Sequence, residues 1–254
     1  MSEKSRYNVI GIEISSVTME QAVDTIVSAI SSGSGGYVCF ANVHTTVMAR
    51  QDDNYKGIIE NSLMSVPDGR PLYWTGIIKG IKNIEHLPGP DFMPNIFAYP
   101  KEKPLKHYFY GSTKETINKL VECMKIKFPT EIIAGYESPP FRIQTEDEKN
   151  SSIEKIIESG ADIVWVGLGA PKQEIWMNDN WEKLRPAVLM GVGAAFDFNA
   201  SLLDRAPELM SKLGLEWFYR FCKEPARLWK RYVVTNSIFI SYCIKELVMR
   251  VVKL

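Results

Sequence analysis

The sequence predicts an α/β fold in which a largely parallel sheet is flanked by helices. From Tyr7 to about Met210, short apolar runs alternate with longer segments of helical period, which is the pattern of repeated βα units. Several of these runs stop at a glycine, as expected where a strand turns into a helix. The chain has 254 residues, of which 45% are apolar and 24% charged, so it can bury a core of ordinary size.

The first two elements are predicted close to the N-terminus. An apolar run at residues 8–12 predicts a strand that begins the βα pattern. The segment 18–27 has helical period, and Thr18 and Gln21 are spaced as a capping box at its start. We therefore expect a strand followed by a well-capped helix.

The remaining elements of the sheet follow the same alternation. A second strand is predicted at 37–41, and the segment 45–61 is expected to form one helix. The region 139–150 is rich in proline, charged and polar residues, which predicts a surface loop leading into a helix at 151–159. Further apolar runs predict four more strands, at 106–110, 131–134, 161–166 and 187–190.

Each of those four later strands is followed by a glycine: Gly111, Gly135, Gly167 and Gly191. The carboxyl ends of parallel strands form the ligand crevice of an open α/β sheet, and glycine permits a close approach of a ligand. The alternative is that each glycine only makes a tight βα turn. Four of them together favour a ligand site, with Gly111 and Gly135 among its contacts.

A Gly-x-Gly turn at 167–169 is the strongest local signal for a phosphate. It ends an apolar run, and Pro171 suits the first turn of the helix that follows. Free N–H groups at Gly169 and at the helix start would attract an anion, with Lys172 and Gln173 within reach. The alternative is an ordinary βα connection.

The character of the chain changes after Leu213. We predict a core over residues 1–212 and a helical appendage over 213–254. The appendage is rich in basic and aromatic residues, which favour membrane interfaces, so we expect it to contact a membrane surface. A helix docked on the core with a solvated basic face, or contact with a second copy in a homo-oligomer, is the alternative. In this segment the basic residues Arg220, Lys223, Arg227, Lys230 and Arg231 are interleaved with Trp217, Phe218, Tyr219, Phe221 and Trp229.

Overall composition excludes several classes of protein. Thirty basic and thirty acidic residues balance, so the net charge gives no argument for nucleic-acid binding. The four cysteines are scattered without a paired spacing, and His86 and His107 lack metal-ligand spacing, so neither a disulfide framework nor a metal site is expected. No signal-peptide core and no membrane-spanning segment is apparent. We expect a cytoplasmic protein without a cofactor.

Two carboxylates stand out as candidates for chemistry. Asp68 lies between Pro67 and Gly69, where a carboxylate with a raised pKa could serve as a general base. The alternative is that Pro-Asp-Gly is simply a turn. Asp91 follows shortly after and fits either a substrate contact or the N-cap of a helix.

Four further side chains are predicted at the ligand edge of the sheet. Asn42 and His44 follow the second strand, although a histidine at a helix start often has only a local hydrogen-bonding role. Asp197 could accept hydrogen bonds from a sugar or ribose hydroxyl, and Phe196 could pack on a base. The alternative is an ordinary loop acid beside core aromatic residues.

Taken together, the order of these motifs resembles the WecG/TagA/CpsF family of bacterial glycosyltransferases. The resemblance covers nearly the whole chain, and its Pro-Lys-Gln-Glu and Gly-Leu-Glu-Trp blocks are specific. It rests on Asn42 and on the stretches 66–69, 89–91, 167–174, 191–198, 205–207, 214–220 and 224–227.

The resemblance implies a Rossmann-like core without the Asp-x-Asp metal site of other glycosyltransferases. It implies that Asp68 is the catalytic base, that Gln173 contacts the sugar nucleotide, and that Arg220 and Arg227 bind diphosphate; Lys230 extends the same basic surface. Many mannosaminyltransferase members carry Thr-Pro-Asn where this chain has Phe-Ala-Asn at 40–42.

The implied reaction is a metal-independent, inverting transfer of an N-acetylmannosamine-type or related sugar. The donor would be a UDP-sugar and the acceptor a polyprenyl-diphosphate-linked saccharide, in cell-surface polysaccharide synthesis at the inner face of the membrane. The alternative is a nucleotide-sugar-binding or membrane-recruitment module without catalysis, since a fold does not fix a function.

Overall fold

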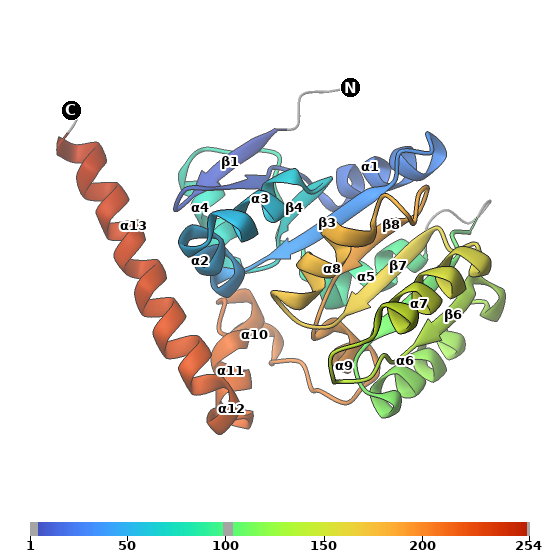
Figure 1. Cartoon of the computed structure of the whole chain (residues 1–254). Helices are drawn as coiled ribbons and strands as arrows, with labels where there is room; N and C mark the ends of the chain where they lie inside the picture. Colours follow the sequence, from blue (N-terminus) through green and yellow to red (C-terminus); the bar gives the residue numbers. More distant parts are fainter. Residues whose placement is uncertain (1–4, 99–103, 253–254) are drawn as a thin grey trace.

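The computed structural model describes residues 5–98 and 104–252 and has an open, six-stranded sheet at its centre (Figure 1). Every neighbouring pair in this sheet is parallel. The predicted α/β class with a parallel sheet is therefore confirmed. The order of the strands is β4 (Met64–Pro67), β3 (Gly36–Ala41), β8 (Val188–Gly191), β7 (Ile163–Gly167), β5 (His107–Gly111) and β6 (Ile133–Glu137).

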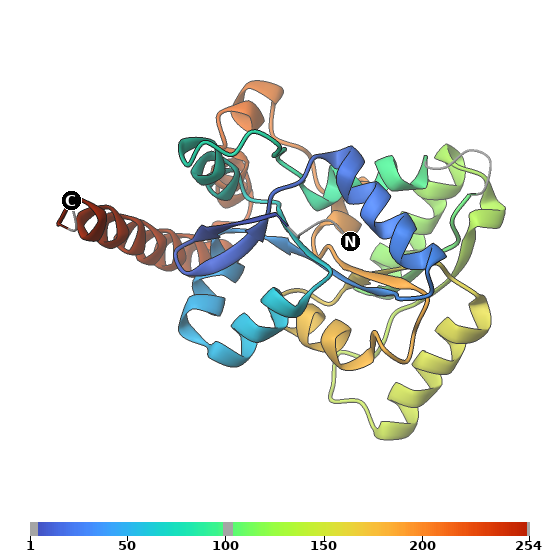
Figure 2. The ribbon, with the colours of Figure 1, turned by 90° about the horizontal axis from the view of Figure 1, so that it is seen from above.

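Helices cover both faces of the sheet, as the view from above shows (Figure 2). One face carries α1 (Met19–Ser31), α5 (Gly89–Phe97), α6 (Lys114–Lys127) and α9 (Ala195–Asn199), which share one buried cluster with the sheet. The other face carries α2 (Val43–Gln51), α3 (Asp53–Asn61), α7 (Glu146–Ser159) and α8 (Lys172–Asn180), which contribute to a second cluster. Apart from the edge strand β6, the strands are buried on both faces, which explains why they appear in the sequence as unbroken apolar runs.

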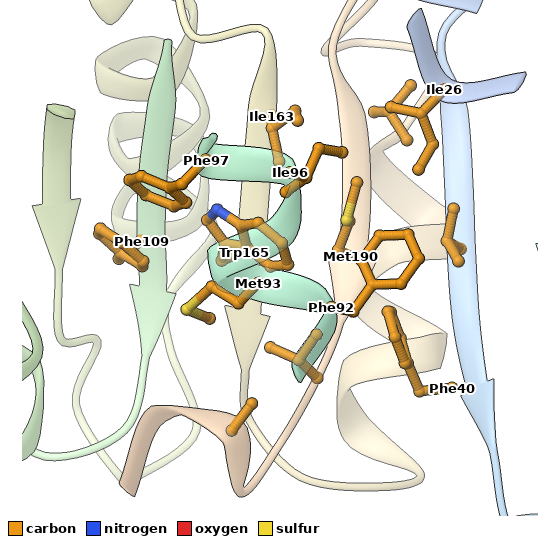
Figure 3. Close-up of a cluster of buried hydrophobic side chains, with 14 of the residues drawn as sticks. Ile26, Phe40, Phe92, Met93, Ile96, Phe97, Phe109, Ile163, Trp165 and Met190 are labelled. Atoms are coloured by element: carbon orange, nitrogen blue, oxygen red, sulfur yellow. The ribbon is translucent and has the colours of Figure 1, made fainter. Parts of the chain in front are cut away.

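The first cluster fixes α5 against the sheet (Figure 3). Phe92 of α5 packs edge-on against Phe40 of β3, with ring centroids 5.2 Å apart. At the other end of α5, Phe97 stacks on His107, which accepts a hydrogen bond from the indole N–H of Trp165 at 3.1 Å. Burial lowers the pKa of His107 to about 3, so this histidine is a neutral part of the core.

The N-terminal run predicted as one strand is a hairpin. Strands β1 (Arg6–Val9) and β2 (Ile12–Ser15) are antiparallel and form a separate two-stranded sheet. Ile10 and Gly11 make the turn, both with positive φ, and the Gly11 N–H donates to the Asn8 side chain at 2.8 Å. The prediction was wrong because the apolar Ile10 hid the turn within an apolar run.

Two predicted boundaries and one missed strand are corrected by the structure. The helix predicted at 45–61 is two helices, because the Asp52 carboxylate accepts hydrogen bonds from the first turn of α3. Helix α7 begins inside the predicted loop, where Thr145 and Glu148 form a capping box. Strand β4 was missed because its four buried residues are too few to show a period. The capping box predicted at the start of α1 is confirmed.

Three of the four glycines predicted to follow strands lie at strand ends, and the fourth does not. Gly111, Gly167 and Gly191 end their strands, as predicted. Gly135 instead lies inside β6, where a Cβ atom would come within 2.6 Å of the Tyr108 ring. Its small size serves packing within the sheet.

Between β4 and α5 the chain forms α4 (Arg70–Ile78), and the C-terminal segment that follows α9 is helical, as predicted. Its helices are α10 (Glu208–Lys212), α11 (Glu216–Lys223), α12 (Pro225–Trp229), a π-helical turn at Lys230–Val234 and α13 (Thr235–Val252). Helix α13 packs against α2 through a face that includes the buried Phe239 (Figure 1). Among the described residues, no helix combines the length and apolarity needed to cross a bilayer.

The packing of α5 generates a stability prediction. Replacing Phe92 with alanine leaves a cavity under α5, so we expect the free energy of unfolding to fall by about 3–5 kcal/mol. The control is Ile126→Ala on α6, where the side chain is 84% exposed and the change should stay within about 0.5 kcal/mol. Denaturant unfolding of both variants measures the difference, and equal midpoints would contradict this account of the core.

Candidate active site

A pocket of about 460 Å³ opens at the carboxyl ends of β3, β4, β7 and β8. Loops of the core form one wall, and α11 together with the start of α13 forms the other. The chain leaves β3 toward α2 on one face of the sheet and leaves β8 toward α9 on the opposite face. Such a divergence between adjacent strands opens a crevice at the sheet edge, where α/β proteins bind ligands.

Asp68 lies in this pocket directly after β4. Its Oδ1 accepts a hydrogen bond from the Gly89 N–H at 3.0 Å, and its Oδ2 accepts one from Asn42 Nδ2 at 3.3 Å. Its own N–H donates to the Ala41 carbonyl at 2.9 Å, which ties the loop to the end of β3. The carboxylate is therefore held in one orientation from two sides.

Asn42 performs two tasks that require an amide. Its Oδ1 accepts hydrogen bonds from the N–H groups of His44 and Thr45 and so caps α2, and the Thr45 hydroxyl accepts from the Asn42 N–H in return. Its Nδ2 is thereby directed at Asp68. An aspartate in this position could cap the helix but could not donate to the carboxylate.

Gly69 permits this close approach. A Cβ atom on Gly69 would lie 3.0 Å from the Asn42 Cα and 3.2 Å from its Cβ. A larger residue would push the loop after β4 away from the loop after β3. The small size of Gly69 is thus what lets the two side chains come together.

Burial dominates the ionisation of Asp68. It raises the pKa of this carboxyl from 3.8 to about 6, against the opposing hydrogen bonds from Gly89 and Asn42. Two residues of α11 act on the same carboxyl: Glu216 raises the pKa and Arg220 lowers it. The group is a carboxylate at pH 7 with a proton affinity well above that of an ordinary aspartate.

His86 supports the same loop from outside the sheet. Burial and the neighbouring Arg70 guanidinium lower the pKa of His86 to about 4, so the ring is neutral at pH 7. Its Nε2 lies 2.7 Å from the Asp68 carbonyl oxygen, which means that Nε2 carries the proton and donates it. The sequence had offered no role for this histidine.

Two arginines of the pocket lining each have a buried donor without a partner in the described part of the chain. Arg70 begins α4 in the core, and Arg220 belongs to α11 of the C-terminal segment. Both line the pocket, and the Nε–H of each is buried without a hydrogen-bond partner among the described residues. Buried guanidinium donors of this kind suit a phosphate or diphosphate ligand.

Arg205 bridges the core and the C-terminal segment. Its guanidinium forms an ion pair with Asp91 of α5 and a second one with Glu216 of α11, at 3.3 Å. Arg205 and Arg220 also both lie over the Phe198 ring, at 5.2 and 5.4 Å from its centroid. These contacts fix α11 so that Arg220 stands at the pocket.

Gln173 lines the pocket, but its side chain is occupied within the protein. Its Oε1 accepts from the Gly169 N–H at 3.1 Å, and its Nε2 donates to the Gly191 carbonyl and to Glu174. The N–H of Gly169, predicted as a free phosphate donor, is therefore already bonded. The motif ties the loop after β7 to the end of β8 and shapes the pocket wall.

The structure brings only some of the predicted residues to the pocket. Asn42, His44, Asp68, Gly169, Gln173 and Arg220 line it. Lys172 is exposed at the start of α8, Asp91 pairs with Arg205, and Asp197 contacts the Thr116 hydroxyl of α6 at 3.4 Å. Gly111 and Gly135 lie on β5 and β6, outside the lining. The side chains of Arg227 and Lys230 lie outside the described part of the structure.

The aromatic prediction after β8 is shifted by two residues. Phe196, expected to pack on a base, is buried in the core against Phe109. Phe198 lines the pocket instead. Arg70 was also missed, although Pro71 marks a helix start at Arg70, shortly after Asp68 in the chain. Within the described ranges, no group of three or more His, Cys, Asp and Glu side chains is placed to hold a metal ion.

Comparison with known proteins agrees with the sequence resemblance. The sequence model described as "Glycosyl transferase WecG/TagA/CpsF family" matches residues 7–252, which is nearly the whole chain. The match includes the C-terminal helices as well as the sheet. The pocket wall formed by α11 and α13 therefore belongs to the same family pattern as the core.

Several curated relatives carry the name N-acetylglucosaminyldiphosphoundecaprenol N-acetyl-beta-D-mannosaminyltransferase. A protein of Bacillus spizizenii is 29% identical over 202 residues, which cover 80% of this chain and 76% of the relative. One of Bacillus subtilis is 29% identical over 198 residues, covering 78% and 75% of the two chains. One of Staphylococcus aureus is 25% identical over 244 residues, covering 93% and 91%.

The Arg205 bridge generates a prediction about α11. Arg205→Gln removes both ion pairs and the contact with Phe198, so we expect hydrogen exchange of the α11 amides to accelerate by roughly fivefold to tenfold. Arg142→Gln is the matched control, because it breaks an ion pair with Glu148 at a distant loop. Unchanged exchange in α11 of the Arg205 variant would show that the bridge does not hold this helix.

Proposed function

The chain belongs to the WecG/TagA/CpsF family of glycosyl transferases, and from this premise we propose that it transfers N-acetylmannosamine, or a related sugar, from a UDP-sugar to a polyprenyl-diphosphate-linked N-acetylglucosamine acceptor. The names of its relatives support the sugar and the acceptor. The observation that carries the proposal is the Asp68 carboxylate, oriented from two sides in a pocket that Arg220 of α11 also lines.

The reaction is a single displacement at the anomeric carbon. Asp68 accepts the proton of the acceptor hydroxyl while that oxygen attacks the anomeric carbon of the donor. The bond from this carbon to the diphosphate oxygen breaks, and UDP leaves with the electron pair. Attack opposite the leaving group inverts the anomeric configuration, and the proton remains on Asp68 until solvent removes it.

The environment of Asp68 suits a general base. With a pKa of about 6, the group is ionised at pH 7 yet binds a proton more strongly than an ordinary aspartate does. Asn42 and the Gly89 N–H keep the carboxylate in place for the incoming hydroxyl. The neutral His86 holds the backbone of the same residue without adding a positive charge that would oppose protonation.

Positive charge must stabilise the departing diphosphate, and side chains of the protein can supply it. Arg220 faces the pocket with a buried, unpartnered Nε–H, and a guanidinium can bind phosphate oxygens in a bidentate manner. Arg205 and Phe198 hold it in position. We therefore assign the leaving group to Arg220 and propose that the transfer does not require a metal ion.

A binding module without catalysis is the second candidate. It would need the arginines but not a carboxylate with a raised pKa. The burial of Asp68 favours catalysis, because burying a carboxylate lowers the stability of the folded protein and a site that only binds has no use for it.

We also propose that the protein works at the inner face of the cytoplasmic membrane. Trp217, Phe218 and Trp229 are exposed large aromatic residues on α11 and α12, and the basic Lys223 ends α11 between them in the chain. Aromatic and basic side chains together favour the headgroup region of an anionic bilayer. Such docking would place the pocket beside a lipid-linked acceptor.

The central test is Asp68→Asn, assayed by acceptor-dependent UDP release in the presence of a chelator. Loss of the base should lower kcat by about 10²-fold to 10⁴-fold with UDP binding unchanged, whereas Asp147→Asn on α7 should be neutral. In the unsubstituted protein, kcat/KM should fall as the pH drops below about 6. Transfer near the original rate would exclude Asp68 as the base.

The same substitution predicts a change in stability with pH. The folded-state pKa of Asp68 is raised, so the folded protein retains this proton between about pH 4 and 6 and loses stability as the pH rises through that window. Asn cannot ionise, so the variant should be more stable than the original protein above pH 6 and similar below pH 4. Thermal melts at both ends of the window check this.

Membrane docking is tested by vesicle sedimentation. The double substitution Phe218→Ser and Trp229→Ser should lower binding to phosphatidylglycerol-containing vesicles about tenfold or more, because two exposed aromatic anchors are lost. Phe141→Ser, at an aromatic residue in the loop before α7 that is even more exposed, is the control. Equal sedimentation of both variants would contradict docking through α11 and α12.

A further inference from the structure

An apolar stripe runs along α13 from inside the pocket to the outer surface. Ile240 lines the pocket, and Ile244, Leu247 and Val248 follow at helical spacing on the same side. All four side chains are at least half exposed. The packed side of the helix is a different one, since Phe239 is buried against the core.

A second stripe leaves the pocket along α4. Arg70 lines the pocket at the start of the helix, and Trp74, Ile77 and Ile78 follow at intervals of four, three and one residues. All three apolar side chains are exposed, and Ile78 is 84% exposed. From Arg70 to Ile78 the helix rises about 12 Å.

Both stripes begin at the same pocket, because Arg70 of α4 and Ile240 of α13 both line it. The two helices also share a packing partner in the core, since Tyr73 of α4 and Tyr242 of α13 both pack against the second buried cluster. Exposed apolar side chains on both helices therefore lead outward from one pocket.

The chemistry of this surface matches an amphiphile. At its inner end the Arg70 Nε–H is buried without a partner among the described residues, which suits a diphosphate. From that point outward the side chains are hydrocarbon. A ligand with a diphosphate head and a long hydrocarbon tail would satisfy both ends, whereas a UDP-sugar has no such tail.

We propose that the stripes on α4 and α13 form a track for the isoprenoid chain of the acceptor, with the acceptor's diphosphate bound at Arg70. This inference rests on the proposed function, because it assigns a position to the lipid-linked substrate. It also divides the two diphosphates of the reaction: the donor's belongs to Arg220 and the acceptor's to Arg70. The apolar side chains converge on the pocket, which favours a single chain over a flat contact with the bilayer.

The first test measures binding directly and needs no turnover. Farnesyl diphosphate and inorganic diphosphate are titrated into the full-length protein and into the double variant Ile78→Asn, Ile244→Asn. We expect the Kd for farnesyl diphosphate to rise about tenfold or more, because both walls lose apolar contact area, and the Kd for inorganic diphosphate to stay the same. Both positions are exposed, so the fold should persist, and Ile126→Asn on α6 is the matched control.

The second test uses acceptor analogues that carry either one isoprenoid unit or a farnesyl chain, assayed without membranes. The original protein should prefer the farnesyl acceptor in kcat/KM about tenfold or more, and the double variant should lose this preference while turning over the short acceptor at the original rate.

The outcomes separate the two proposals. Equal Kd values for farnesyl diphosphate in the variant and the original protein would overturn the track. A variant that loses vesicle binding but keeps the chain-length preference would also overturn it, because the stripes would then contact the bilayer. If no acceptor is turned over but farnesyl diphosphate binding still depends on Ile78 and Ile244, the track stands and the proposed transfer fails.

Discussion

The close contact between the loops after β3 and β4 is the constraint on which the site depends. Parallel pairing places Ala41 beside Pro67, so the next residues on each strand, Asn42 and Asp68, must meet. Gly69 lets the two loops approach, since any Cβ there would meet Asn42. Asn42 then uses one end of its amide to begin α2 and the other to hold Asp68. The same side chain, Asn42, therefore both starts helix α2 and orients the Asp68 carboxylate.

Burial gives that arrangement its chemistry. A carboxylate removed from water gains proton affinity, and hydrogen bonds from Asn42 and Gly89 only partly offset the shift. The C-terminal helices complete the electrostatics, because Arg220 and Glu216 of α11 act on Asp68 from the far wall. Arg205 ties this wall to the core. The electrostatics of the pocket therefore depend on where α11 lies, because Glu216 and Arg220 act on Asp68 from that helix.

Long-range packing explains why the most specific motif in the sequence has a structural task. The Gly-x-Gly turn and Gln173 looked like a phosphate cradle, yet the Gln173 side chain bonds Gly169 on its own loop and Gly191 on the next strand. A sequence pattern shows which groups could donate or accept, but it does not show which of them are already used. Arg70 and His86 show the opposite case, since neither belongs to a strong pattern and yet both line the pocket that contains Asp68.

The sequence by itself determined the α/β class, most strands, the capped start of α1 and the family, because these follow from local periodicity, capping chemistry and motif order. Tertiary structure alone decided which side chains reach the pocket. Successive residues of a helix turn by about 100°, so Phe198 faces the ligand space while Phe196 is buried, and Gln173 points inward while Lys172 is exposed. The rotation of each helix is set by residues far away in the chain that it packs against, and no local pattern contains that information.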